Sequence, residues 1–290
     1  MDLDGQPLDL DVTLTCGQAF RWHKRADGVW QGVVGERLVE LRVRDSILYW
    51  RTSPEDGLEL VRDYLRMGDD VNCIYGVLGA SDPHLQAAIS RFHGLRLLRQ
   101  DPVETLLSFV CSAANSIPRI SAAIEEMARI YGQLVCEQEG LCYYAFPKPE
   151  RLACLQPRVL NSVGSLGFRG EVLRSVSRHI IDRGKGWLPG LRVAGYEEAK
   201  RQLVEIRGVG AKIADCVCLF ALDKDEAVPV DTHVRQLAHR LFLPDMKAKS
   251  VTDGVYRQVA QAFREKYGKY AGWAQQFLFY EDLLGSRGRS

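Results

Sequence analysis

Lys212 and Asp231 are the residues of this sequence whose types and surroundings best suit covalent chemistry. Lys212 follows a turn marked by Gly208 and Gly210, with apolar residues on both sides. Glycines at this spacing allow a tight turn, whose free N–H groups, with those of the next helix, can bind a phosphate oxygen. The positive end of that helix's dipole disfavours an ammonium at position 212. Lys212 is therefore a candidate nucleophile that reacts as a neutral amine.

The chain between these two residues is long enough to bring Asp231 back to the level of Lys212. If residues 211–222 form a helix, they rise about 18 Å. The segment 223–230, when extended, can span up to about 26 Å. A simpler function for Asp231 is to cap a helix over residues 232–243. A capping carboxylate is fixed by backbone donors, so the two functions are compatible.

Neighbours of this pair have structural as well as functional interpretations. Cys216 lies four residues after Lys212 on the same helix face, where it either lines a cavity before the amine or packs in the core. His233 falls in the first turn after Asp231, where it either contacts phosphate or is an ordinary surface residue. The glycine turn itself could end one helix before another that carries an exposed lysine.

Residues near both ends of the chain could recognise a nucleobase. Gln275 and Phe279 are spaced i, i+4, which sets an amide beside an aromatic face. Such a pair can bind the edge of a base and stack on its ring. An amphipathic helix that buries Trp273 and Phe277 explains the neighbouring positions in any case. Gly17 interrupts an expected strand, which can mark the close approach of a ligand to the backbone.

Two further segments combine small or aromatic residues with arginine. In the first, Ala114 and Asn115 interrupt a helix ahead of Arg119, and in the second Phe168 precedes Arg169 in a glycine-flanked loop. An aromatic wedge with arginines beside it is what the opening of a DNA duplex requires. Either segment could also be an ordinary exposed loop.

Composition restricts the class of protein. The chain has 290 residues, 46% of them hydrophobic, and a net charge of +1. A nucleic-acid partner would therefore be bound through local contacts and not by a global basic field. The eight cysteines include no CxxC pair, which argues against a zinc site or a four-cysteine cluster, and scattered thiols are typical of a reducing compartment. No apolar run approaches the length of about 18 residues that predicts a membrane span.

The hydrophobic pattern predicts an α+β protein. Residues 1–50 have the short, partly alternating pattern of an antiparallel sheet with one exposed face. Helical spacing begins near Pro54, and from Pro102 onward nearly everything is predicted to be helical. We expect an N-terminal sheet domain with flanking helices over residues 1–98. A helical body over residues 99–290, with two helical subdomains and a hairpin near 203–215, would follow.

Together these motifs resemble the 8-oxoguanine DNA glycosylase/AP lyases of the helix–hairpin–helix glycosylase superfamily. The resemblance extends along nearly the whole chain, and the Gly-Val-Gly-x-Lys turn with a later Val-Pro-Val-Asp is typical of lyase-type members. The segments that carry it are Cys16–Trp22, Leu97–Pro102, Val110–Ile120, Gly208–Asp215, Ala227–Asp231 and Tyr270–Gln275.

The resemblance implies a monomer that acts on damaged double-stranded DNA without a metal ion or other cofactor. Lys212 would attack C1′ of the damaged nucleotide, giving a Schiff base, and β-elimination would then nick the strand. Asp231 would stabilise the developing oxocarbenium charge. Such a protein is expected inside the cell and associated with DNA, in a nucleus or nucleoid, without contact to a membrane.

The resemblance also implies how the base and the DNA are bound. The Gly17 carbonyl would accept from the protonated N7 that distinguishes 8-oxoguanine from guanine, and Gln275 would bind the base edge. Phe279 and Cys216 would sandwich the ring, and His233 would contact phosphate. The hairpin of Gly208 and Gly210 would hold the DNA backbone, Phe168 would fill the space of the flipped nucleotide, and Arg119 and Arg169 would read the orphaned cytosine.

Two positions depart from the family pattern. Ala114 stands where animal members often have an asparagine beside the cytosine, next to Asn115 here, and Phe168 stands where tyrosine is common. We therefore expect looser discrimination of the opposite base. Two other classes are also consistent with parts of the pattern: an alkylated-base glycosylase, which uses water and no lysine, and a non-enzymatic DNA-binding hairpin module in which Lys212 only contacts phosphate.

Overall fold

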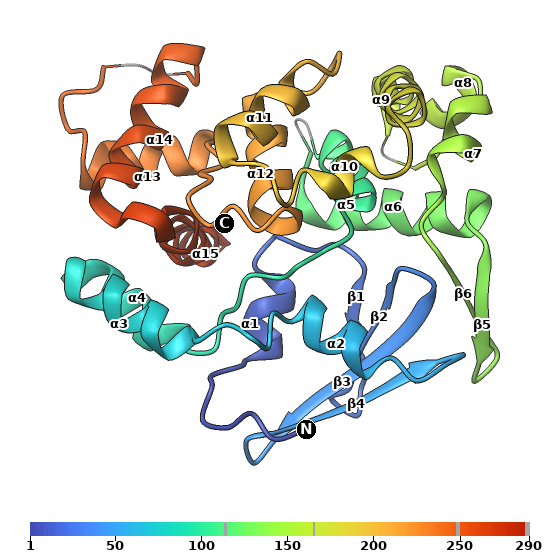
Figure 1. The fold of residues 1–290 in the computed structure, drawn as a ribbon, viewed down its shortest axis with the longest axis horizontal. Helices are drawn as coiled ribbons and strands as arrows, with labels where there is room; N and C mark the ends of the chain where they lie inside the picture. The colour runs from blue at the N-terminus through green and yellow to red at the C-terminus, as the bar shows by residue number, and fades with distance from the viewer. Residues whose placement is uncertain (113–114, 165, 248–249, 288–290) are drawn as a thin grey trace.

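The N-terminal sheet is antiparallel, with strand order β1-β2-β3-β4. The computed structural model describes residues 1–112, 115–164, 166–247 and 250–287. The sheet and the helices that flank it are α1 (Leu10–Thr15), β1 (Trp22–Lys24), β2 (Trp30–Val34), β3 (Arg37–Arg44), β4 (Ile47–Ser53) and α2 (Leu58–Tyr64). Trp30, Leu41 and Trp50 lie opposite one another in register across three strands. In Figure 1 this sheet lies at the bottom of the molecule, with the helices of the body above it.

Part of the N-terminal strand prediction is wrong. Residues 10–15 form helix α1, because Asp9 caps it by accepting from Val12 N at 3.1 Å. Gly17 lies in the bend between α1 and β1 and not within a strand. Asp9 is a local signal for a helix, but the alternating apolar pattern of the following strands led to the prediction of strands for this segment as well.

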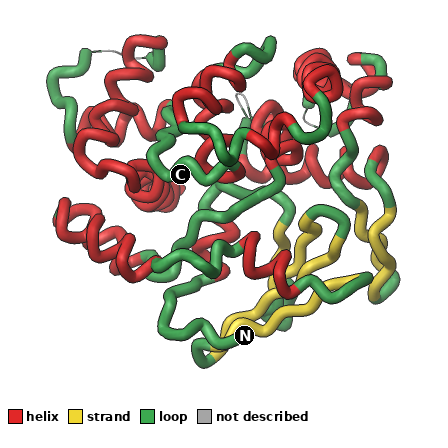
Figure 2. Tube along the Cα trace, viewed as in Figure 1, coloured by secondary structure: helices red, strands yellow, loops and turns green. Residues whose placement is uncertain are grey.

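The remaining chain is mainly helical, as Figure 2 shows by colour. Its elements are α3 (Val71–Ser81), α4 (Pro83–Arg91), α5 (Pro102–Cys111), α6 (Ile117–Tyr131), β5 (Leu134–Gln138), β6 (Leu141–Tyr144), α7 (Pro149–Cys154), α8 (Pro157–Asn161), η1 (Gly167–Arg169), α9 (Gly170–Arg183), α10 (Trp187–Gly190), α11 (Tyr196–Val204), α12 (Ala211–Ala221), α13 (Thr232–Leu241), α14 (Asp253–Tyr267), η2 (Gly268–Tyr270) and α15 (Ala271–Arg287). No helix among these described residues is long and apolar enough to cross a membrane.

The predicted α+β class is confirmed, with one addition to the helical body. The β5–β6 hairpin was not predicted, and it lies beside the N-terminal sheet (Figure 1). Two hydrogen bonds attach it there: Tyr143 donates to Gln31 Oε1 at 2.8 Å, and Gln138 donates to Glu40 Oε1 at 3.0 Å. The hairpin therefore extends the contact between the body and the sheet.

Two hydrophobic cores hold the molecule together. The smaller core lies between the sheet and helices α1 and α2, and it includes Leu41, Leu48 and Leu65. The larger core belongs to the helical body, and it includes residues of α3 and α4 such as Leu78 and Leu85. These two helices precede residue 99 yet share the core of the body. The division of the chain between residues 98 and 99 therefore stays a prediction.

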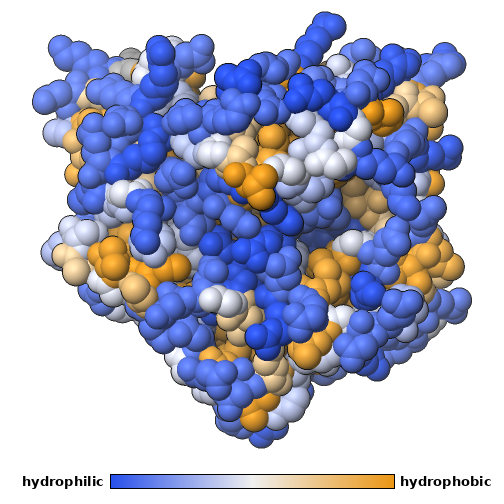
Figure 3. Space-filling view, viewed as in Figure 1, coloured by the Kyte–Doolittle hydropathy of each residue, from blue (hydrophilic) through white to orange (hydrophobic). Residues whose placement is uncertain are grey.

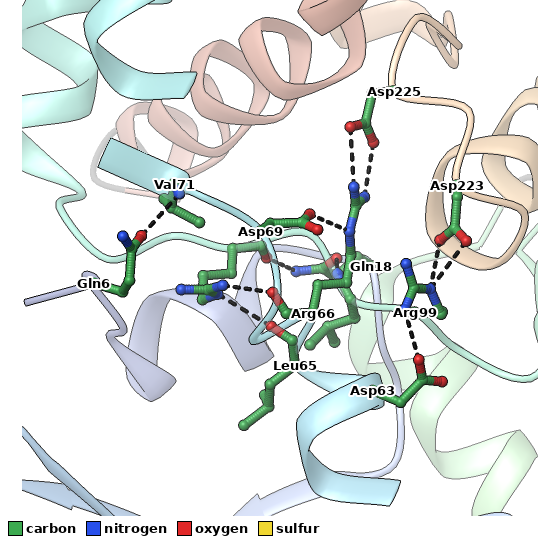
Figure 4. Close-up of polar contacts among 12 residues, drawn as sticks. Gln6, Gln18, Asp63, Leu65, Arg66, Asp69, Val71, Arg99, Asp223 and Asp225 are labelled. Atoms are coloured by element: carbon green, nitrogen blue, oxygen red, sulfur yellow. Dashed lines mark hydrogen bonds and ion pairs between the residues drawn. The ribbon is translucent and has the colours of Figure 1, made fainter. Parts of the chain in front are cut away.

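Two arginines join the sheet domain to the loop that follows α12. The Arg66 guanidinium donates two hydrogen bonds to Asp225, at 2.7 and 3.0 Å. Arg99 Nε lies 2.8 and 3.0 Å from the two carboxylate oxygens of Asp223, and its Nη1 bonds Asp63 at 2.5 Å. Figure 4 shows both arginines reaching the loop that follows α12. The junction is largely hydrophilic on the face seen in Figure 3.

Helix α15 begins directly against this loop. Gly272 N donates to Asp225 O at 2.7 Å. A Cβ at position 272 would lie 2.3 Å from Leu219 Cδ1 and 2.6 Å from Ala227 O. Such distances leave no room for a side chain. Gly272 therefore sets the position of α15, which carries Gln275 and Phe279.

We expect Gly272→Ala to destabilise the protein by about 1–3 kcal/mol, because the added methyl group overpacks the contact with the loop. Gly285→Ala is the matched control, since Gly285 lies on the same helix and a Cβ there would meet nothing within 4 Å. Chemical denaturation of both variants measures the difference. Equal stability of the two would contradict this account of Gly272.

Candidate functional site

The hairpin before α12 has the tight turn that its glycines predict. Gly208 has a φ of +92°, and a Cβ there would lie 2.5 Å from Val172 Cγ1 on α9. Position 208 therefore requires glycine for two reasons, backbone conformation and close packing. Gly210 is the N-cap residue of α12, with open space around it. No side chain at position 210 therefore blocks access to the N–H groups of this turn and of the first turn of α12.

Lys212 lies in the first turn of α12 and is half-buried. Its Nζ donates to Ser112 Oγ at 3.2 Å, across the end of α5. The same nitrogen lies 5.3 Å from the centre of the Phe109 ring. The amine is therefore neither sealed in the core nor extended into solvent. Ser112 and Phe109 are contacts of Lys212 that the sequence did not reveal, because they lie about a hundred residues away in the chain.

Asp231 is the N-cap of α13, as one of its two predicted functions requires. Its carboxylate accepts from Val234 N at 2.9 Å, which fixes the side chain. Helix α13 ends at Leu241, two residues before the predicted end.

The buried Cys216 thiol brings Lys212 and Asp231 into one neighbourhood. Burial raises the pKa of this thiol to about 12; the Lys212 ammonium opposes the rise, and the Asp215 and Asp231 carboxylates add to it. The charges of Lys212 and Asp231 therefore both influence the pKa of this thiol. Cys216 is 2% exposed, so it is a neutral, packed side chain at this site.

Gly17 and Phe279 are neighbours in space. Gly17 has a φ of +86°, and a Cβ there would lie 3.4 Å from Phe279 Cε1 and 3.2 Å from Ile117 Cδ1. The Phe279 ring in turn lies edge-on to the His233 ring, with centroids 6.2 Å apart. The bend after α1, the start of α6 and helix α15 thus meet at one place.

Two adjacent glutamines on α15 have different surroundings. Gln275 is 3% exposed, and its Oε1 has no hydrogen-bond partner among the described residues. An unpaired buried carbonyl costs about 1–3 kcal/mol, so this atom is suited to meet a donor on a ligand. Gln276 Nε2 donates to Cys16 O at 2.7 Å and so fixes the residue before Gly17. Gln276 is a supporting residue that the sequence analysis missed.

Gln18 holds the other side of the same bend. It is fully buried, and its Nε2 donates to Thr13 O at 2.9 Å and to Arg96 O at 2.8 Å. Its Oε1 accepts from Leu98 N at 3.0 Å. The Gly17 backbone is therefore fixed from both sides, by Gln18 and by Gln276.

The exposed ring of Phe168 packs against the buried guanidinium of Arg169. Phe168 is 73% exposed at the short helix η1, whereas Arg169 is 7% exposed. The Arg169 guanidinium lies 4.8 Å from the centre of the Phe168 ring, and its Nη1 donates to Leu166 O at 3.0 Å. Arg169 therefore supports the ring from below, while its predicted contact with a cytosine stays a prediction.

The predicted segment before α6 is described in part. Ala114 lies outside the described residues. Asn115 Oδ1 accepts from Ser116 N at 3.1 Å, and its buried Nδ2 has no hydrogen-bond partner among the described residues. Arg119 lies in the first turn of α6 and is exposed. The Asn115 amide and Arg119 thus remain candidates for contacts with a ligand.

His233 is oriented by an acid on α15. Its Nδ1 lies 3.1 Å from Asp282 Oδ2, and Arg240 Nη2 donates to Asp282 Oδ1 at 2.8 Å. Burial alone would raise the pKa of Asp282, but its bonds with Arg240 and His233 hold that pKa below its usual range. The ionised Asp282 therefore fixes the orientation of the His233 ring.

Two family models together match most of the chain. The first, "8-oxoguanine DNA glycosylase, N-terminal domain", matches residues 1–106. The second, "HhH-GPD superfamily base excision DNA repair protein", matches residues 107–265.

Similar proteins match nearly the full length of this chain. The N-glycosylase/DNA lyase OGG1 of Arabidopsis thaliana is 34% identical over 95% of this chain and 78% of that protein. The N-glycosylase/DNA lyase of Saccharomyces cerevisiae is 27% identical over 97% of this chain and 85% of that protein. The structure of the Clostridium acetobutylicum 8-oxoguanine glycosylase/lyase, in complex with double-stranded DNA containing cytosine opposite 8-oxoguanine, superposes with a TM-score of 0.87 at 31% identity. That superposition covers 96% of this chain and 93% of that chain.

Substitutions at Asp231 should separate its capping function from its charge. Asp231→Ala is expected to cost about 1 kcal/mol of stability, whereas Asp231→Asn should cost much less, because asparagine is as good an N-cap as aspartate. Urea unfolding gives both values. Thr252→Ala, which removes the cap of α14, is the reference for a lost cap. Equal losses for Asn and Ala would show that the cap depends on the charge.

Proposed function

Because this chain belongs to the 8-oxoguanine N-glycosylase/DNA lyase family of the HhH-GPD base excision repair superfamily, we propose that it excises 8-oxoguanine from duplex DNA and then cleaves the strand. The observation that carries this proposal is the half-buried Lys212 amine in the first turn of α12, bonded to Ser112 Oγ, together with the Asp231 carboxylate fixed at the N-terminus of α13. A reactive amine and a fixed carboxylate in one neighbourhood are what a glycosylase with a lysine nucleophile needs.

In the proposed reaction the damaged nucleotide is flipped out of the duplex towards Lys212. The neutral Nζ forms a bond to C1′ as the bond from C1′ to the base breaks, and the electron pair leaves with the base. Asp231, held by Val234 N, stabilises the positive charge that develops on the sugar. The attached amine then loses a proton, and the C1′–O4′ bond breaks as O4′ takes up a proton, which opens the sugar ring and gives a Schiff base. The Schiff base acidifies the proton on C2′. Loss of that proton and departure of the 3′ phosphate then cleave the strand.

Recognition of the base would fall to the residues around Gly17. The carbonyl of Gly17 would accept from the N7–H that 8-oxoguanine has and guanine lacks. The unpaired Gln275 Oε1 would accept from the edge of the base, and Phe279 and Cys216 would hold its two faces. The contact of Gly17 with Phe279 supports this arrangement, because both residues would touch one bound ring.

The DNA itself would be held by local contacts. The N–H groups around Gly208 and Gly210 would bind the backbone, and His233 would bind a second phosphate. Phe168 would enter the duplex where the damaged nucleotide leaves, supported by Arg169, while Arg119 would approach the opposite base, which we propose is cytosine. With Ala114 and Phe168 in place of the residues common in animals, discrimination of the opposite base should be loose.

Lys212→Gln should abolish the covalent adduct that borohydride traps on a duplex with 8-oxoguanine opposite cytosine. Base release should fall by about a hundredfold or more, because the nucleophile is lost. The exposed Lys185, which lies after α9, provides the control Lys185→Gln, which should trap at the wild-type level.

The same assay separates the proposal from its rivals. Trapping by Lys212→Gln at full yield would contradict the nucleophile assignment. An alkylated-base glycosylase would release methylated purines and give no trapped adduct. A binding module would bind intact and damaged duplex alike and release no base.

Phe168→Ala should weaken binding to the damaged duplex by about 1–3 kcal/mol, which is the usual contribution of one aromatic ring that stacks on bases. Stability should hardly change, because the ring is 73% exposed. Val193→Ala, at an apolar residue that is 94% exposed, controls for loss of surface area. Fluorescence anisotropy measures the affinities, and equal affinity of the two variants would exclude Phe168 from the interface.

A further inference from the structure

A buried carboxylate, Asp215, lies one helical turn after Lys212. It is fully buried, and three side chains donate to it: Tyr196 at 2.8 Å, Lys200 at 2.8 Å and Tyr256 at 2.5 Å. Lys200 Nζ also lies 5.1 Å from the centre of the Tyr256 ring. Asp215 is thus satisfied within the protein, and it has no need of a ligand.

The Tyr256 hydroxyl contacts a second part of the site. Val230 N donates to it at 3.4 Å, and Val228 O lies 3.2 Å away. A hydroxyl has a single proton, so it donates to the closer, charged Asp215 and accepts from Val230 N. Burial raises the pKa of Tyr256 well above its ordinary value, and the nearby Asp215 charge adds to this, so the phenol keeps that proton. The hydroxyl therefore bridges α12 and the segment that immediately precedes Asp231.

This bridge lies near the end of α12 that carries the nucleophile. The chain runs up α12 from Lys212, turns through residues 222–227, and returns along residues 228–230 to Asp231. The turn at the far end is held by Arg66 through Asp225. Tyr256, on α14, joins the two arms between that turn and the reactive pair. Apart from this bridge, the buried Val228 and Val230 hold the return segment by apolar packing.

We propose that Tyr256 is a positioning residue whose hydroxyl fixes the separation between the Lys212 amine and the Asp231 carboxylate. The inference rests on the proposed function, because the separation matters only if both groups act on one sugar. A small displacement of either group would slow base excision while leaving DNA binding intact. The bridge acts through Asp215 and Val230, so Tyr256 itself does not need to touch the DNA.

Two tyrosines provide matched controls for Tyr256→Phe. Tyr267 lies on the same helix, is equally buried at 5% exposure, and donates to a carboxylate, Asp82, at 2.8 Å. Tyr267→Phe therefore removes the same kind of bond from α14 at another place. Tyr196→Phe removes a bond from Asp215 itself and leaves the contact with Val230 intact. Tyr267→Phe shows the effect of losing any buried hydrogen bond from α14, and Tyr196→Phe shows the effect of losing a donor to Asp215. An effect seen with Tyr256→Phe alone would belong to the bridge between Asp215 and Val230.

The experiment measures single-turnover release of 8-oxoguanine at saturating enzyme, affinity for a duplex with a reduced abasic site, and thermal unfolding. For Tyr256→Phe we expect excision about 10- to 100-fold slower, with affinity unchanged. Tyr267→Phe and Tyr196→Phe should excise at the wild-type rate, even where their melting temperatures fall as far as that of Tyr256→Phe.

Three results would overturn the inference. The first is an equal excision rate for Tyr256→Phe and Tyr267→Phe, and the second is a Tyr196→Phe variant as slow as Tyr256→Phe. The third is a Tyr256→Phe protein that fails to fold, because the hydroxyl would then serve the fold and not the spacing. Failure of the proposed function would look different. The wild-type protein itself would release no 8-oxoguanine, whatever the variants do.

Discussion

The contact on which the rest of the structure depends is made by the buried guanidinium of Arg66. Burial alone would lower its pKa, but the hydrogen bonds and charge of Asp225 outweigh that effect, so Arg66 stays ionised. It donates two hydrogen bonds to Asp225, forms an ion pair with Asp69 at an N–O distance of 2.7 Å, and lies 5.6 Å from the centre of the Trp273 ring. A buried charge is tolerated only when it is paired this fully, and a bidentate fork allows little freedom of orientation. Arg66 therefore fixes the sheet domain against the loop after α12 (Figure 4), and its contact with Trp273 reaches the start of α15.

That junction matters because the site is assembled from distant parts of the chain. Gly17 comes from the sheet domain, Lys212 from α12, Asp231 from the return segment and Gln275 from α15. Asp225 lies on the connection between Lys212 and Asp231, and Trp273 lies two residues before Gln275. The Arg66 guanidinium thus ties the elements that carry Lys212, Asp231 and Gln275 to the sheet domain, which carries Gly17. Gln276 adds a direct bond from α15 to Cys16 O.

The sequence predicted those features that local chemistry decides. The turn at Gly208 needs a positive φ, and Asp231 caps the helix that follows it, so both could be inferred from a few residues. The β5–β6 hairpin was missed because Leu134 and Leu141 are 59% and 60% exposed, which removes the alternation that marks a strand. The sequence could not reveal Tyr256 or Gln276, because their partners lie far away in the chain. Gln276 and Cys16, for example, are 260 residues apart.

The surroundings of Gly17 and Gln275 divide the proposed recognition of the base into two tasks. Guanine and 8-oxoguanine present the same donors on their pairing edge, so the unpaired Gln275 Oε1 can select guanine-type bases but cannot detect the oxidation. Detection must then fall to the Gly17 carbonyl, which would meet a proton on N7 of the lesion but a lone pair on N7 of guanine. A carbonyl can make this distinction only if it cannot turn away. The bonds of Gln18 and Gln276 on either side of Gly17 supply that rigidity, so the proposed recognition of the lesion explains why the bend after α1 is held on both sides although the proposed nucleophile lies on another element.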